Sequence, residues 1–108
     1  MSDADAMAEG LGPARAAAVR AIRGGHLLHH TASEDPDLAL LDGDRLFALG
    51  LAELAAAGDL AAVRTMAEVI ATSAAALAVG DEAAAETAWD QGIRALAGSG
   101  EPPSGADR

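Results

Sequence analysis

The sequence predicts an all-α fold, a small antiparallel bundle of three or four helices that is completed by oligomerisation. Between residues 13 and 97 apolar residues recur at spacings of three and four, and no segment alternates apolar and polar residues as a strand does. Gly-Asp and Asp-Pro pairs separate the periodic segments. The 108 residues suffice for one domain, and alanine at 30 positions leaves little apolar area for the core of a single copy. A second copy is therefore expected to complete the core.

Both ends of the chain lack this periodicity. Residues 1–12 are irregular and acidic, and residues 98–108 are rich in glycine, proline, serine and charge. Such segments bury too little apolar surface to fold, so disordered tails are expected on both sides of a helical domain over residues 13–97.

The first helix is expected to begin at Pro13, because proline suits the first helical position, and to continue through Ile22. Gly24 and Gly25 are predicted to stop or kink it, with a short continuation over residues 26–30.

Aspartate and glycine mark the ends of the other helices. Asp35 and Pro36 predict the start of a second helix that runs to about Ala57. Gly-Asp pairs at 58–59 and 80–81 each combine a left-handed C-terminal glycine with an aspartate cap. The third helix follows the first of these pairs, and the fourth spans about 82–97. One face of the fourth helix is formed by Ala85, Trp89, Ile93 and Leu96.

The third helix carries a coiled-coil-like seam, in which spacings of three and four alternate over about 2.5 heptads. Alanine at two seam positions would allow close approach of another helix. The seam is predicted to join copies of the chain and consists of Leu60, Val63, Ala67, Ile70, Ala74 and Leu77.

The second helix carries a track of small residues, Ala39, Gly43, Gly50 and Ala57. Each internal glycine costs up to about 1 kcal/mol relative to alanine, so the two glycines indicate close contact with another backbone or with an elongated apolar ligand. Packing against a helix of the same chain is the favoured interpretation. The alternative is an apolar ligand site formed by Leu38, Leu41, Gly43, Phe47, Gly50 and Leu54.

Charge and composition exclude several classes of function. The net charge of −10 repels nucleic acid and anionic lipid, and the absence of cysteine excludes disulfides and thiol chemistry. The longest uncharged run, residues 69–80, is too short to span a bilayer, so no transmembrane segment is expected. The acidic first residues do not resemble a secretory signal, so a cytoplasmic location is expected. The use of arginine and alanine without lysine suggests a bacterial, GC-rich genome.

The three histidines, His26, His29 and His30, are weak candidates for a metal site. On a helix, His26 lies beside both His29 and His30, which follow it by three and four residues. A His-x-x-x-His pair can chelate a transition metal. The favoured interpretation is no metal, because imidazoles near a helix end also interact with its negative dipole end and with nearby acids. No phosphate loop, serine elbow or cysteine nucleophile is present, so no catalytic residue is predicted.

Residues 26 to about 80 resemble part of the trans-isoprenyl diphosphate synthases, the all-α polyprenyl synthetases. In that family a Leu-x-His-Asp-Asp helix end precedes a Leu-x-Gly-Asp-x-Leu element. Here the segment 27–29, Leu-Leu-His, matches the first up to its histidine, and the segment 41–46, Leu-Asp-Gly-Asp-Arg-Leu, matches the second. The segment 58–70, GDLAAVRTMAEVI, is similar to the helix that follows.

The departures from the family pattern concern its chemistry. The family's aspartates after the histidine hold magnesium and the allylic diphosphate, whereas this sequence has His30 and Thr31 there and no second aspartate-rich motif. The chain is therefore expected to be a truncated, degenerate relative that is not an enzyme and needs no cofactor.

The resemblance and the seam lead to three functional hypotheses. The first is a non-catalytic oligomeric accessory or scaffold subunit, either a homo-oligomer or in complex with a larger protein. The second, implied by the resemblance, is a protein that binds an isoprenoid tail, polyprenyl or quinone, beside a partner enzyme. The third is a small regulatory subunit of a heteromeric prenyl synthase.

Overall fold

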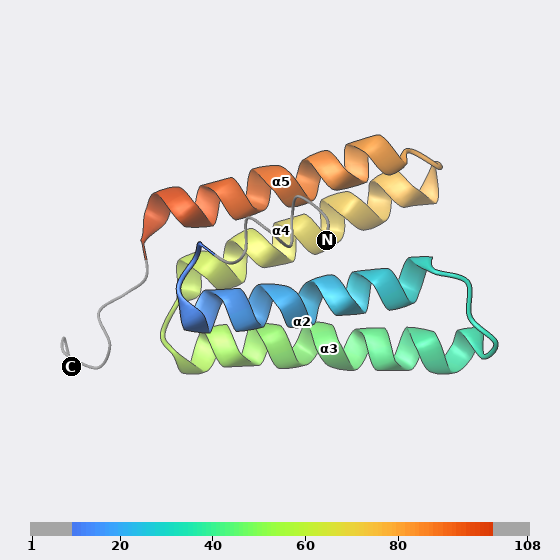
Figure 1. Cartoon of the computed structure of the whole chain (residues 1–108), viewed down its shortest axis with the longest axis horizontal. Helices are drawn as coiled ribbons and strands as arrows, with labels where there is room; N and C mark the ends of the chain where they lie inside the picture. Colours follow the sequence, from blue (N-terminus) through green and yellow to red (C-terminus); the bar gives the residue numbers. More distant parts are fainter. Residues whose placement is uncertain (1–9, 101–108) are drawn as a thin grey trace.

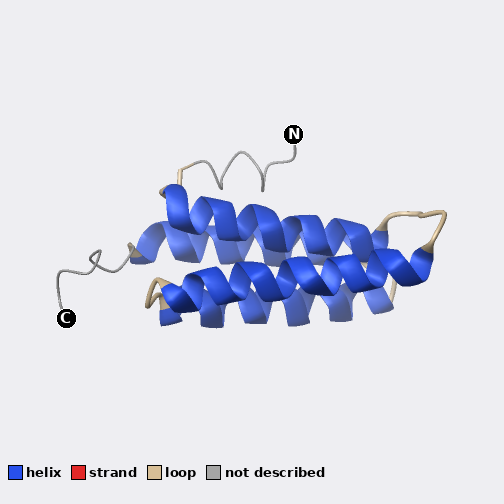
Figure 2. Ribbon diagram, turned by 90° about the horizontal axis from the view of Figure 1, so that it is seen from below, coloured by secondary structure: helices blue, strands red, loops and turns tan. Residues whose placement is uncertain are grey.

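The computed structural model describes residues 10–100, which form four helices joined by short loops (Figure 1, Figure 2). The helices are α2 (Pro13–His30), α3 (Pro36–Ala56), α4 (Leu60–Ala78) and α5 (Glu82–Ser99). Consecutive helices run in opposite directions, and the described residues include no strand. The predicted all-α antiparallel bundle is confirmed.

The predicted tails lie mostly outside the described residues, which begin at residue 10 and end at residue 100. Three described residues, Leu11, Gly98 and Ser99, differ from the prediction. Leu11 is buried in the core, because it precedes the helix start and can pack back onto the first turn. The last helix, α5, continues to Ser99 instead of ending near residue 97.

The first helix is continuous, so the predicted stop or kink at Gly24-Gly25 is wrong. Helix α2 passes through both glycines and ends at His30. A Cβ atom at Gly25 would lie 2.6 Å from the carbonyl oxygen of Gly43 on α3. The glycine therefore permits close contact between two helices, and the packing gained outweighs a propensity cost of about 1 kcal/mol.

Helix ends follow the predicted glycine and aspartate signals. Gly58 and Gly80 have φ angles of 76° and 75°, in the left-handed region that a side chain disfavours. The amides at 59 and 81 then bond back to carbonyls five residues earlier, which closes each helix. Asp35, Asp59 and Asp81 each accept a hydrogen bond from the amide three residues later and cap α3, α4 and α5.

The four helices form two tight hairpins, α2 with α3 and α4 with α5 (Figure 1). In the first hairpin, a Cβ at Gly43 would lie 2.9 Å from the Gly25 carbonyl oxygen, and one at Gly50 would lie 2.9 Å from that of Ala18. In the second, a Cβ at Gly92 would collide with Val69. The predicted small-residue track therefore packs against a helix of the same chain, as favoured, except that Ala57 is exposed.

Large side chains fill the space between the hairpins. Small residues allow the two helices of each hairpin to pack closely. The core between the two hairpins contains most of the large apolar side chains. All four residues predicted on one face of α5 are buried. The most deeply buried apolar side chains are Ile22, Leu54, Met66, Trp89, Ile93 and Leu96.

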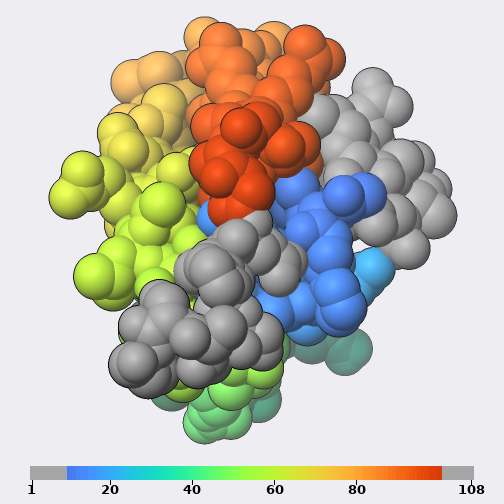
Figure 3. All heavy atoms as spheres, turned by 90° about the vertical axis from the view of Figure 1, so that its left-hand side faces the viewer, coloured from blue at the N-terminus to red at the C-terminus, as the bar shows by residue number. Residues whose placement is uncertain are grey.

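Figure 3 shows the end of the bundle where α2 begins, α3 meets α4, and α5 ends. A buried ion pair between Arg15 and Asp59 lies inside this end. The Arg15 side chain donates to both carboxylate oxygens of Asp59, at 2.6 and 3.0 Å, and to the Leu96 carbonyl oxygen at 2.8 Å. Arg15 is 2% exposed and Asp59 is 4% exposed. Hydrogen bonding from Arg15 lowers the pKa of Asp59. The pair thus connects three helices from both hairpins.

Candidate functional site

The candidate site lies at the opposite end of the bundle, where α2 ends with its three histidines. The three side chains differ in how deeply they are buried and in which helix they contact. His29 lies toward α3, whereas His26 and His30 line a cavity beside the start of α5. The cluster predicted from sequence is therefore divided between two neighbouring helices.

His29 is held by α3. Its Nε2 atom lies 3.1 Å from the Leu40 carbonyl oxygen and 3.1 Å from an Asp44 carboxylate oxygen. Its ring meets that of Phe47 edge to face, with centroids 4.9 Å apart. These contacts hold the ring directly over Gly43, where the glycine has no side chain. His29 therefore has a packing role that needs no metal.

His26 is buried against α5. It is 5% exposed, and its ring meets the indole of Trp89 edge to face at 5.3 Å. Within residues 10–100 neither ring nitrogen of His26 has a hydrogen-bond partner. The ring of His30, one turn later, lies 4.9 Å away.

Arg23 links the same part of α2 to α5. Its Nη2 donates to Glu86 at 3.0 Å, and its guanidinium lies 5.2 Å from the centre of the Trp89 ring. Its Nε and Nη1 atoms and the indole nitrogen of Trp89 are buried without a hydrogen-bond partner among the described residues. Polar contacts between the hairpins are therefore less complete at this end than around Arg15.

The cavity between α2 and α5 has a volume of about 220 Å³. Two imidazoles from α2 and two carboxylates from α5 supply its polar lining, and aliphatic side chains supply the rest. Neutral imidazoles beside carboxylates can accept protons or bind a metal ion. The lining residues are His26, Leu27, His30, Leu77, Glu82, Ala85 and Glu86.

The histidine environment predicts acid sensitivity. Burial, with Arg23 and His30 nearby, lowers the pKa of His26 from 6.5 to about 4, although Glu86 acts in the opposite direction. Burial also lowers the pKa of His30. Because the unfolded chain binds these protons more readily, the free energy of unfolding should fall as the pH drops from 6.5 toward 4. Well above pH 6.5, where both the folded and the unfolded chain are deprotonated at these groups, they should contribute no pH dependence.

Urea unfolding at several pH values checks this prediction. His26→Phe keeps a ring beside Trp89 without a titrating nitrogen, so its stability should depend less on pH over that range. Leu41→Ala is the control, because Leu41 is 62% exposed, does not titrate and does not line this cavity. An unchanged pH dependence in His26→Phe would contradict the prediction.

The structure does not bring the predicted apolar ligand residues around one cavity. Gly43, Gly50 and Leu54 are buried inside the bundle, and Phe47 is partly buried. Leu38 and Leu41 lie on the outer surface, 51% and 62% exposed. A separate hollow of about 330 Å³ lies at the α2–α3 turn, and Leu28 and Leu40 are among its apolar residues.

The predicted seam lies on the outward side of α4. Leu60 is 71% exposed, and both alanines of the seam are exposed. Val63, Ile70 and Leu77 are partly buried, and Val63 and Ile70 also pack against the core of the same chain. The side of α4 that faces the core is instead formed by Ala62, Met66, Val69 and Ser73.

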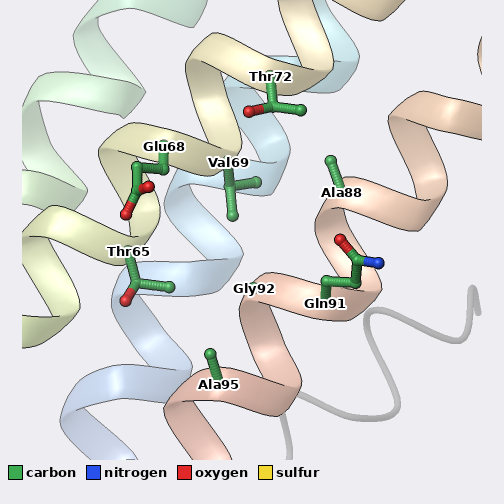
Figure 4. Close-up of a pocket in the computed structure, with 8 residues that line it drawn as sticks. All are labelled: Thr65, Glu68, Val69, Thr72, Ala88, Gln91, Gly92 and Ala95. Atoms are coloured by element: carbon green, nitrogen blue, oxygen red, sulfur yellow. The ribbon is translucent and has the colours of Figure 1, made fainter.

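A shallow groove of about 270 Å³ runs between α4 and α5 (Figure 4). Gly92 of α5 forms part of its lining. Val69 of α4 approaches Gly92 so closely that there is no space for a side chain at this position. Thr65, Thr72 and Gln91 give it a polar rim, and Glu68 is its single titratable residue. The groove thus has no acid–base pair and follows from helix packing.

No protein family, curated protein or solved structure matches this chain. Within residues 10–100, no group of three or more histidine, cysteine or acidic side chains is arranged to hold a metal ion. Among the described helices, α4 alone is long and apolar enough to cross a membrane by length and composition. It carries Arg64 and Glu68, each of which would cost about 3 kcal/mol near a bilayer centre, so α4 is no clear transmembrane segment.

The polar contacts of Arg15, Arg23 and Trp89 were not predicted from the sequence. A signal for the two arginines was present in the sequence, because Arg15 is three residues before Ala18 and Arg23 is four residues after Val19, both of which are core positions of α2. A charged residue on an apolar face is often buried with a partner. The identity of that partner depends on how the helices pack.

Proposed function

We propose that this chain is a non-catalytic helical scaffold subunit that self-associates, with the outward side of α4 packed against α4 of a second copy. The exposure of α4 is the observation that carries this proposal. Its composition is apolar enough for a membrane span, yet 22% of that stretch is buried inside the bundle. An apolar helix with so little cover favours association with a further surface.

The seam residues are complementary to themselves in an antiparallel pair. With a two-fold axis between Ala67 and Ile70, each of these two residues lies opposite the other on the second copy. Val63 then lies opposite Ala74, and Leu60 opposite Leu77. In two of these three kinds of pair an alanine meets a larger residue, so the helices can approach closely at the centre, and Leu60 meets Leu77 at both ends.

Charge also favours this surface over others. The chain carries a net charge of −10, so two copies repel each other at a distance. None of the six seam residues is charged, and Arg64 and Glu68 are the only charged residues of α4. Contact through α4 therefore brings fewer like charges together than contact through the acidic loops. Added salt should strengthen association by screening the repulsion.

Arginine at the centre of the seam should weaken self-association. Ala67→Arg and Ala74→Arg place a long charged side chain where a helix is expected to pack, so the dissociation constant should rise about tenfold or more. Sedimentation velocity over a range of protein concentrations measures the change. Both alanines are exposed in the single chain, so each variant should keep the fold, which circular dichroism can verify.

Ala17→Arg is the matched control, because Ala17 is an exposed alanine on the outer side of α2 and the change in charge is the same. It should associate as the unmodified chain does. A chain that stays monomeric at about 100 μM would overturn the proposal, because self-association through α4 would then be worth less than about 5.5 kcal/mol. Equal weakening by Ala17→Arg would also overturn it.

The same preparation separates the alternatives suggested by sequence. Native mass spectrometry with organic extraction would detect an isoprenoid if the protein bound one. A bound isoprenoid would support the tail-binding hypothesis, and a stable complex with a larger protein would support the hetero-complex. A homo-oligomer without ligand supports the scaffold function.

A further inference from the structure

Two pairs of metal-ligand side chains face the cavity between α2 and α5. His26 and His30 are four residues apart on α2, and Glu82 and Glu86 are four residues apart on α5. Residues at this spacing lie on one face of a helix. Each helix therefore presents two donor side chains to the same space, and the two helices belong to different hairpins.

We propose that this cavity binds one divalent transition-metal ion, with the imidazoles of His26 and His30 and the carboxylate of Glu82 as its protein ligands. Imidazole and carboxylate donors suit Zn²⁺, Co²⁺ and Ni²⁺, whereas Mg²⁺ and Ca²⁺ prefer sites made of oxygen alone. Water completes the coordination on the open side.

The state of His26 is the first support. The side chain is almost completely buried, it lines the cavity, and neither ring nitrogen has a hydrogen-bond partner among the described residues. Neither nitrogen is one of the solvent-inaccessible atoms that lack a partner, so both keep some access to the cavity. The neighbouring His30 ring, with its centroid 4.9 Å away, is close enough to share an ion after small side-chain rotations.

Charge around the cavity is the second support. Arg23 lies next to His26 and opposes a cation, but Glu86 already neutralises it at 3.0 Å. The carboxylate of Glu82 then remains to balance the charge of the ion. Glu82 has no ion pair among the described residues, so it is available as a ligand.

Closing the site requires Glu82 to move. In the described conformation no three donor groups are within metal-binding geometry of each other. Glu82 is exposed in the first turn of α5, so its side chain can change rotamer, and fixing it costs conformational entropy.

The ion would join the two hairpins at the end of the bundle where their polar contacts are incomplete. The opposite end is held by the ion pair of Arg15 and Asp59. Here the main polar contact between hairpins is that of Arg23 with the half-exposed Glu86. Metal binding should therefore raise the unfolding temperature as well as produce a binding signal.

Calorimetric titration of the full chain, without an affinity tag and after treatment with a chelator, tests the proposal. With Zn²⁺ at about pH 7.5, where imidazoles are deprotonated, one ion per chain should bind with a micromolar dissociation constant. His30→Gln and Glu82→Gln should each weaken binding about tenfold or more. Both residues are exposed, so neither variant should disturb the fold.

His29→Gln is the matched control, because it removes a histidine one residue away that lies against α3. It should bind Zn²⁺ as the unmodified chain does. Absence of saturable binding up to about 1 mM Zn²⁺ would overturn the proposal, and so would equal weakening by His29→Gln and His30→Gln. These variants leave the seam of α4 unchanged, so the result is independent of the self-association experiment.

Discussion

Replacing Arg15 with methionine should destabilise the protein by about 3–5 kcal/mol, because it leaves the buried carboxylate of Asp59 without its partner. Methionine fills a similar length of space, so the loss is mainly electrostatic and not a cavity. A domain of this size has a total stability of about 5–15 kcal/mol. Urea unfolding monitored by circular dichroism, with stability determined from the midpoint and slope, measures the change.

A second variant keeps the prediction testable if Arg15→Met does not fold. Replacing Asp59 with leucine as well removes both charges, and such double replacements are often close to neutral. The double variant also loses the cap on the Ala62 amide, which costs about 1 kcal/mol. It should therefore be more stable than Arg15→Met alone. If the double variant is less stable than the single one, the buried charge is not the cause.

Arg45→Ala is the control for the ion pair. The Arg45 side chain is 78% exposed and pairs with Asp42 at 3.3 Å on the surface of α3. Exposed pairs contribute about 0–1 kcal/mol, so its loss should be nearly neutral.

The same ion pair predicts a response to acid. Hydrogen bonding from Arg15 lowers the pKa of Asp59 below 3.8, so the folded state releases this proton more readily than the unfolded state. The stabilisation is complete above that value and is lost as the pH falls through the lowered pKa. This part of the acid response should be absent in Arg15→Met.

Local signals predicted most of the fold. Gly58 and Gly80 require a left-handed backbone, and the aspartate after each one caps the next helix. Both effects act within a few residues, so sequence alone determines them. The buried face of α5 followed its helical period for the same reason. Trp89 and Ile93 are both buried there as expected.

Signals that depend on a distant partner were harder to interpret. Gly25 disfavours a helix locally, but here it allows contact with the Gly43 backbone, so the helix continues. Asp59 was predicted as a cap, yet its ion pair with Arg15 joins residues 44 positions apart. His26 and Glu82 lie at one cavity only because α2 and α5 are adjacent. Sequence spacing within a helix contains no information on such pairs.

Gly25→Ala should destabilise the protein by about 2 kcal/mol, although alanine is the better helix former by about 1 kcal/mol. The added Cβ would lie 2.6 Å from the Gly43 carbonyl oxygen and 2.9 Å from the Phe47 ring. The ring could rotate away, but the carbonyl belongs to the backbone of α3. The two helices would have to separate, which would loosen the core layer around Phe47.

Gly98→Ala provides the opposite result and so serves as the matched control. Gly98 lies in the last turn of α5, and a Cβ there would have no atom within 4 Å. The propensity of alanine should therefore act alone and stabilise the protein by about 0.5–1 kcal/mol. Urea unfolding of the two variants should give changes of opposite sign. Stabilisation by Gly25→Ala would mean that α2 and α3 do not pack through this glycine. Alanine favours the helix at both positions, so it should lower stability only where its Cβ atom meets the backbone of another helix.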